Sequence, residues 1–136
     1  MAVTIYGNYI GKKHVELKHE PSGSIIVTEA PKDNGGTGSK FSPTDLVAAG
    51  LGSCILTILS LVAEKDGFDL SHMTATVNKT MSTAPRRIGK LETVIHLPSN
   101  LANEQRTRVE KAAMTCPVHH SLHPEIEAPI QFIYDL

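Results

Sequence analysis

The hydrophobic pattern of this chain is dominated by one stretch, residues 43–65 (PTDLVAAGLGSCILTILSLVAEK), with no charged residue between Leu46 and Ala63. Its apolar residues recur all round a helix instead of forming one stripe, which is typical of a helix buried on every side. A chain of 136 residues has little interior in which to bury such a helix. We therefore expect a second copy of the chain to cover part of it.

Residues at both ends of this stretch are typical of helix boundaries. Ser42 can act as the N-cap, a proline follows at the first helical position, and Asp45 can complete a capping box. Lys65 and Gly67 suit the last turn and the residue just after it. The sequence therefore predicts one long helix over residues 43–66.

A membrane span is the alternative interpretation of this helix. A span needs ~20 strongly apolar residues. The uncharged part here is interrupted by glycine, serine and threonine and is flanked closely by polar residues. We therefore expect a core helix, and no membrane partner.

Alternating and β-branched segments predict strands on both sides of the helix. Before it, a meander of three strands leads into a glycine-rich loop, and after it two strands form a hairpin. The predicted strands are 2–10, 13–19, 24–30, 73–81 and 87–97, and the loop is 31–40.

The C-terminal third predicts a second helix over residues 101–115, with Asn100 as its cap and Pro117 ending it. Residues 118–127 then form a connector to a last strand at 129–134. The predicted fold class is α+β, with antiparallel sheet and helices on one side, in a single domain of residues 1–136.

Composition narrows the possible partners and the compartment. The net charge is −1, and there are three Phe, three Tyr and no Trp, so neither charge nor aromatic residues favour nucleic acid. The N-terminal residues lack the basic and apolar regions of a signal peptide. We expect a cytoplasmic protein.

The two cysteines are the main candidates for chemistry. Cys54 lies in the middle of the long helix, and Cys116 lies 62 positions later, at the end of the second helix. Cysteines in a reducing compartment are more typically reactive, metal-binding or buried than structural disulfides. If the two helices pack together, the thiols can come within disulfide reach, which needs Cα atoms ~4.4–6.8 Å apart.

Two such thiols suffice for peroxide reduction. A thiolate attacks the O–O bond and becomes a sulfenic acid, which the second thiol converts to a disulfide. An attacking thiol needs a nearby cation or a helix N-terminus, and Cys54 is about three turns into its helix. Candidate cations are Lys12, Lys13, Arg86, Arg87 or one of the histidines that follow Cys116. The alternative, that both cysteines are small buried hydrophobes, stays open.

Three histidines follow Cys116 and raise the possibility of a metal site. Cys116 and His119, or His120 and His123, have spacings found in zinc sites, but no second ligand pair completes a set. We expect no metal there. The histidines are expected to hydrogen-bond a carbonyl or to move protons near Cys116.

Two motifs in order, PTDLVAAGLGSC and AAMTCPVHHSL, resemble the OsmC/Ohr family of osmotically inducible and organic hydroperoxide resistance proteins. The GGTGSKFSP loop, the PRR turn and the overall length also fit this family. The resemblance covers nearly the whole chain and is closest to the OsmC-like branch.

This resemblance implies an intertwined, swapped OsmC-like homodimer in which Cys54 is the peroxidatic cysteine and Cys116 the resolving one. It implies organic and fatty-acid hydroperoxides as substrates, and a dithiol or a dihydrolipoyl protein as reductant, in oxidative-stress defence. It implies that no metal or organic cofactor is needed. The alternative is a dimer that binds an apolar ligand or senses redox state without turnover.

The chain departs from the family at the residues expected to activate the thiol. The family carries an N-terminal arginine that pairs with the reactive thiolate and with a glutamate directly after the helix-start proline. Here the first 85 residues contain no arginine, Thr44 follows Pro43, and the acid comes one position later as Asp45. Arg86 is the candidate thiolate partner, and Asp45 the candidate acid.

Overall fold

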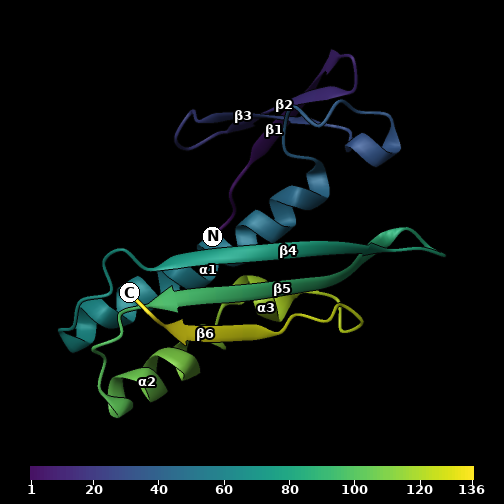
Figure 1. Ribbon diagram of the computed structural model, residues 1–136. Helices are drawn as coiled ribbons and strands as arrows, with labels where there is room; N and C mark the ends of the chain where they lie inside the picture. Colours follow the sequence, from purple (N-terminus) through teal and green to yellow (C-terminus); the bar gives the residue numbers. More distant parts are fainter. The chain divides into compact units, whose positions relative to one another are not determined.

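The computed structural model describes residues 1–136, which form two compact units, residues 1–47 and residues 48–136. Figure 1 shows the elements of both units along the chain. Whether the two units act as one domain, as the sequence predicts, stays a prediction.

The first unit is built on a three-stranded antiparallel sheet in the order β1-β2-β3. Its strands are β1 (Ile5–Gly11), β2 (His14–His19) and β3 (Ile25–Glu29). The β1–β2 turn places Gly11, Lys12 and Lys13 at φ of 95°, 53° and 63°. The predicted meander is therefore confirmed.

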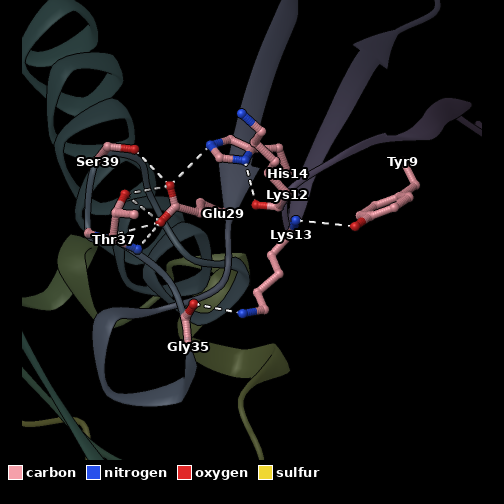
Figure 2. Close-up of polar contacts among 9 residues, drawn as sticks. Tyr9, Lys12, Lys13, His14, Glu29, Gly35, Thr37 and Ser39 are labelled. Carbon is pink, nitrogen blue, oxygen red and sulfur yellow. Dashed lines mark hydrogen bonds and ion pairs between the residues drawn. The ribbon is translucent and has the colours of Figure 1, made fainter.

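The glycine-rich loop after β3 is held by the carboxylate of Glu29, which is 2% exposed. This carboxylate accepts hydrogen bonds from the backbone N–H and hydroxyl of Thr37 and from the hydroxyl of Ser39 at 2.7 Å. His14 Nε2 lies 3.0 Å from it, as Figure 2 shows. The loop also contains a short 3₁₀ helix, η1 (Lys32–Asn34). The contacts of Glu29 fix the segment that leads to the long helix.

Helix α1 (Pro43–Asp66) has the predicted bounds. Its capping box is present: the Ser42 backbone N–H donates to the Asp45 carboxylate at 2.8 Å, and the Asp45 N–H donates to the Ser42 hydroxyl at 3.1 Å. By length and composition α1 could cross a membrane, a test that core helices of soluble proteins also pass.

Only one face of α1 is buried within a single chain. The buried positions recur at helical spacing and are Ala48, Leu51, Gly52, Ile55, Leu59 and Ala63. Val47 and Leu61 remain 39% and 55% exposed. Burial on every side therefore stays a prediction that requires a second chain.

The second unit contains the other sheet, in the order β4-β5-β6. Strands β4 (Thr74–Ser82) and β5 (Arg87–Leu97) form the predicted hairpin, and β6 (Ile130–Tyr134) is the predicted last strand. However, β6 pairs with β5 in parallel, so the prediction of a purely antiparallel sheet is wrong. The reason is the helical connection after β5, which returns the chain before β6 begins and thus makes a parallel crossover.

Two helices form this connection. Helix α2 (Asn103–Ala113) begins later than predicted: Ala102, not Asn100, is its N-cap, and the Ala102 backbone N–H donates to the Gln105 side chain at 2.9 Å. Helix α3 (Pro117–Ser121) lies where the sequence predicts only a connector.

The helices and β5 share one hydrophobic core. Buried side chains of β5 alternate with half-buried ones, as expected for a strand with one face against helices. Leu51, Ile55 and Leu59 of α1 join Leu91 and Ile95 of β5 in that core. In the same region α1 packs closely against β4. A Cβ atom added at Gly52 would lie 3.0 Å from the Val77 side chain.

Candidate functional site

The two cysteines, 62 positions apart in sequence, lie side by side in the second unit. α1 carries Cys54 in its middle, and Cys116 lies between α2 and α3. The Cys54 thiol is close enough to Cys116 to raise the pKa of the Cys116 thiol, and both cysteines are free. The predicted approach of the two helices' cysteines is therefore present, whereas their reach for a disulfide stays a prediction.

Cys116 is fully buried and caps helix α3. Its sulfur accepts a hydrogen bond from the His119 backbone N–H at 3.4 Å. Burial raises the pKa of the Cys116 thiol above its usual value of 9.0, and the hydrogen bond with Cys54 raises it further, while the His119 N–H acts in the opposite direction. Cys116 therefore keeps its proton at neutral pH.

The two thiols differ in their access to solvent. Cys54 is half-buried, whereas Cys116 has no exposed surface. A reagent from solvent can reach Cys54, and Cys116 can then be reached from Cys54. The pair thus consists of an accessible sulfur and a protected, protonated thiol in contact with it.

The candidate activating residues lie in the predicted turn and at the predicted helix start. Their roles stay predictions. Arg86 lies in the turn between β4 and β5. The Asp45 carboxylate accepts the Ser42 N–H at the start of α1. Lys13 Nζ donates to the Gly35 carbonyl at 2.9 Å, as Figure 2 shows.

The histidines after Cys116 have ordinary structural contacts. His119 Nε2 lies 3.1 Å from the Ala128 carbonyl, and His123 Nδ1 accepts the Glu125 backbone N–H at 3.1 Å. The rings of His119 and His120 meet edge to face at 6.4 Å. No group of three His, Cys, Asp or Glu side chains in residues 1–136 converges as a metal site would require. His119 thus contacts a carbonyl, whereas His123 accepts a backbone N–H instead of contacting one. A role of these histidines in moving protons near Cys116 stays a prediction.

The sequence interpretation missed one buried ionisable group, Glu29. Hydrogen bonds from Ser39 and Thr37 lower the pKa of this carboxyl to about 2, and the charge of His14 adds to the effect. Alternation in β3 gives no signal for it, because the neighbours Thr28 and Glu29 are both buried while the apolar Ile25 and Ile26 are exposed. Its partners were not predictable, because they lie 8 to 15 positions away on a loop and on another strand.

The second unit is an α+β arrangement that brings a half-buried and a buried cysteine close together, which makes it a candidate redox thiol site. Comparison with known proteins agrees, since residues 36–130 match the sequence profile of the OsmC-like proteins. The chain belongs to the OsmC-like family.

Solved structures and a curated relative support this assignment. A Psychrobacter arcticus protein described as an osmotic stress induced and detoxification response protein is 36% identical, with a TM-score of 0.91 over 97% of this chain and 96% of its own. An organic hydroperoxide resistance protein of Elizabethkingia anophelis shares the fold at 19% identity, with a TM-score of 0.79 over 99% and 97%. An uncharacterised Acinetobacter baylyi protein is 28% identical over 77% of this chain and 75% of its own. The solved structures thus share the fold of this chain over nearly its whole length.

Proposed function

We propose that this protein is a thiol-dependent peroxide reductase that reduces organic hydroperoxides, including those of fatty acids. The observation that carries the proposal is the proximity of Cys54 to Cys116 in one chain, close enough for the Cys54 thiol to raise the pKa of Cys116. The fold brings half-buried Cys54 and buried Cys116 together from positions 62 apart in sequence, as a two-cysteine cycle requires.

In the proposed reaction the thiolate of Cys54 attacks one oxygen of the hydroperoxide. The O–O bond breaks, the OH group stays on Cys54 as a sulfenic acid, and the alkoxide takes up the proton that the thiol had released and leaves as an alcohol. The Cys116 sulfur then attacks the Cys54 sulfur, so that a disulfide forms and water is released. A dithiol, free or on a dihydrolipoyl protein, supplies two electrons and two protons and restores both thiols.

The assignment of roles rests on exposure and protonation. Cys54 is the accessible sulfur and is therefore the peroxidatic residue. Cys116 is buried and its pKa is raised, so it remains an unreactive thiol until a sulfenic acid forms beside it. Arg86 is proposed as the cation that favours the Cys54 thiolate, with Asp45 as the candidate acid of the site.

We further propose that the working form is an intertwined homodimer in the cytoplasm. Both faces of the β1–β2–β3 sheet expose apolar side chains, because neighbouring residues of a strand point to opposite faces. The exposed residues include Ile5, Tyr6, Tyr9, Ile10, Ile25 and Ile26, each at least 50% exposed. A second copy of the chain would cover this surface and the free face of α1.

The reaction can be tested with one equivalent of cumene hydroperoxide per chain. We expect both thiols of the native chain to disappear in titration and a disulfide between Cys54 and Cys116 to appear in mass spectrometry. Cys116→Ser should stop at a sulfenic acid on Cys54 that dimedone traps, whereas Cys54→Ser should leave Cys116 unmodified. With dihydrolipoamide as reductant, turnover should be faster with cumene hydroperoxide than with hydrogen peroxide.

Three results would contradict the proposal or a part of it. Both thiols remaining free after peroxide treatment would exclude the cycle and favour the alternative, a ligand-binding dimer without turnover. Equal reactivity of the two single-serine variants would contradict the assigned roles. The role of Arg86 fails if Arg86→Ala leaves the pH profile of Cys54 alkylation unchanged.

A further inference from the structure

The proposed cycle ends with a disulfide that an external dithiol has to open, and its two sulfur atoms differ in burial. Cys116 has no exposed surface and belongs to the hydrophobic core, whereas Cys54 is half-buried and packs against that core. All members of this core lie in residues 48–136 of one chain, so a second copy can only add to the burial of Cys116. The protection of Cys116 therefore does not depend on the oligomeric state.

Thiol–disulfide exchange restricts the direction from which a reductant attacks. The attacking thiolate adds to one sulfur in line with the S–S bond, from the side opposite the sulfur that leaves. Attack on Cys116 would require a path through the packed core behind it. Attack on Cys54 requires a path only on the side away from Cys116. In the proposed reaction the OH group of the sulfenic acid lies on that same side, because Cys116 displaces it in line.

The leaving group opposes attack on Cys54. Such attack expels the Cys116 sulfur, and burial raises the pKa of this thiol, which slows its departure. Two backbone groups offset part of this effect. The His119 N–H donates to the Cys116 sulfur at 3.4 Å, and both this group and the Val118 N–H favour the thiolate. These donors are fixed at the start of α3, so they are already in place when negative charge develops on the sulfur.

Access outweighs the leaving group, because the two effects differ in kind. The rate of exchange depends only partly on the pKa of the leaving thiol, so a raised pKa slows the reaction by a graded factor. Complete burial instead requires the core around Cys116 to open locally before any external thiol can reach this sulfur. Exchange at Cys54 can therefore proceed in the folded chain, whereas exchange at Cys116 has to wait for local unfolding.

We propose that the reductant attacks the Cys54 sulfur of the disulfide, and that Cys116 exchanges only with Cys54 and never with an external reagent. This proposal rests on the two-cysteine cycle of the proposed function. It makes the backbone N–H of His119 a catalytic group, because it contacts the sulfur that leaves.

The reduction then has two steps. One thiolate of the dithiol bonds to the Cys54 sulfur, the Cys54–Cys116 bond breaks, and Cys116 leaves with the electron pair and takes up a proton. The second thiol of the reductant loses its proton and attacks the reductant sulfur held on Cys54. A cyclic disulfide leaves, and Cys54 is released as a thiolate that can take up the second proton. Two electrons and two protons thus pass from the dithiol to the chain.

The experiment locates the mixed disulfide that the full native chain forms with a thiol that cannot close a ring. Diamide is used to make the Cys54–Cys116 disulfide, so that the test does not depend on a peroxide, and 2-mercaptoethanol is then added briefly. Acid stops the exchange, the chain is unfolded, and N-ethylmaleimide labels the free thiols before peptide mapping by mass spectrometry. We expect mercaptoethanol on Cys54 and maleimide on Cys116 in at least about a ten-fold excess over the reverse pattern.

The matched control is the same oxidised chain treated with 2-mercaptoethanol in guanidinium, where both sulfurs are exposed. We expect the preference for Cys54 to disappear there. Mercaptoethanol mainly on Cys116, or equally on both cysteines of the folded chain, would overturn the proposal. So would an equal preference for Cys54 in the unfolded chain, because burial would then not be its cause.

Failure of this proposal and failure of the proposed function give different results. A chain that shows the preference for Cys54 but leaves cumene hydroperoxide unreduced would contradict the peroxide reductase alone. A chain that reduces the peroxide through the disulfide but carries mercaptoethanol on Cys116 would contradict the order of attack alone. Failure of diamide to join Cys54 to Cys116 would overturn both.

Discussion

At the scale of single residues, the contrast between Cys116 and Glu29 shows how burial acts on an ionisable group. Both side chains are almost fully buried. Cys116 has few partners that favour its charged form, so burial dominates and its pKa rises. Glu29 accepts several hydrogen bonds, and these lower its pKa to about 2 despite burial. The same degree of burial thus gives a protonated thiol in one unit and an ionised carboxylate in the other.

The pKa of Glu29 predicts a specific dependence of stability on pH. Because the folded pKa, about 2, is below the ordinary value of 4.5, ionised Glu29 stabilises the fold above pH 4.5, and this contribution is lost as the pH falls toward 2. We expect Glu29→Gln to lower the free energy of unfolding at pH 7 and the difference from the native chain to shrink between pH 4.5 and 2.

Urea titrations of the full chain at pH 7 and pH 3 measure this difference. Glu20→Gln, at an exposed acid of the same unit, is the control and should follow the native curve. The loss of unfolding free energy caused by Glu29→Gln could instead be the same at both pH values. That result would show that the amide disrupts packing and that the charge of Glu29 contributes nothing.

At the scale of elements, α1 combines a local and a distant requirement. Its start is defined by neighbours in sequence, because Ser42 and Asp45 each satisfy the other's backbone N–H. Its buried face is defined by side chains of β4 and β5 much later in the chain. The boundaries of α1 were therefore predictable, whereas the face that meets the sheet was not.

The capping box can be tested with two serine-to-alanine changes in and beside the same helix. Ser42→Ala removes an acceptor for the Asp45 N–H and should lower the free energy of unfolding by about 1 kcal/mol. Ser60→Ala removes a hydroxyl whose contact is with the carbonyl of Thr57, and should change stability by less than ~0.5 kcal/mol. Equal effects of the two changes in urea titration would show that the cap contributes nothing specific.

At the scale of the whole molecule, a single chain leaves apolar surface uncovered in both units. The β1–β2–β3 sheet exposes isoleucine and tyrosine on both faces, and α1 exposes Val47 and Leu61. Monomeric soluble proteins rarely leave large contiguous apolar patches exposed, and such patches mark interaction sites. The proposed homodimer provides the simplest partner, because it requires no other protein.

The dimer predicts a mass in light scattering of twice the 14.7 kDa of one chain. Ile26→Lys places a charge on the exposed face of β3 and should shift the protein toward the single-chain mass, because a buried unpaired charge is costly. Glu20→Lys, at a position just after β2, changes the net charge of the chain by more than Ile26→Lys does. This control variant should remain dimeric. A native mass of one chain at micromolar concentration would contradict the homodimer.

Much of the fold followed from local sequence. The bounds of α1, the capping box, the meander, the β4–β5 hairpin and the last strand are encoded within a few residues of where they occur, by periodicity and by turn and cap residues. The two cysteines could be identified as a candidate pair for the same reason, since each lies at a recognisable place on a helix. The short helix α3 was missed because five residues are too few to show a period.

Only the tertiary structure decided how distant segments meet. It placed Cys54 close to Cys116, made β6 parallel to β5, and enclosed the Glu29 carboxylate with groups from the loop after β3. It also brought α1 and α2 together. These outcomes depend on packing between elements far apart in sequence, and hydrophobic burial, which drives that packing, is not directional. The candidate residues were therefore recognisable in the sequence, while their contacts required the fold.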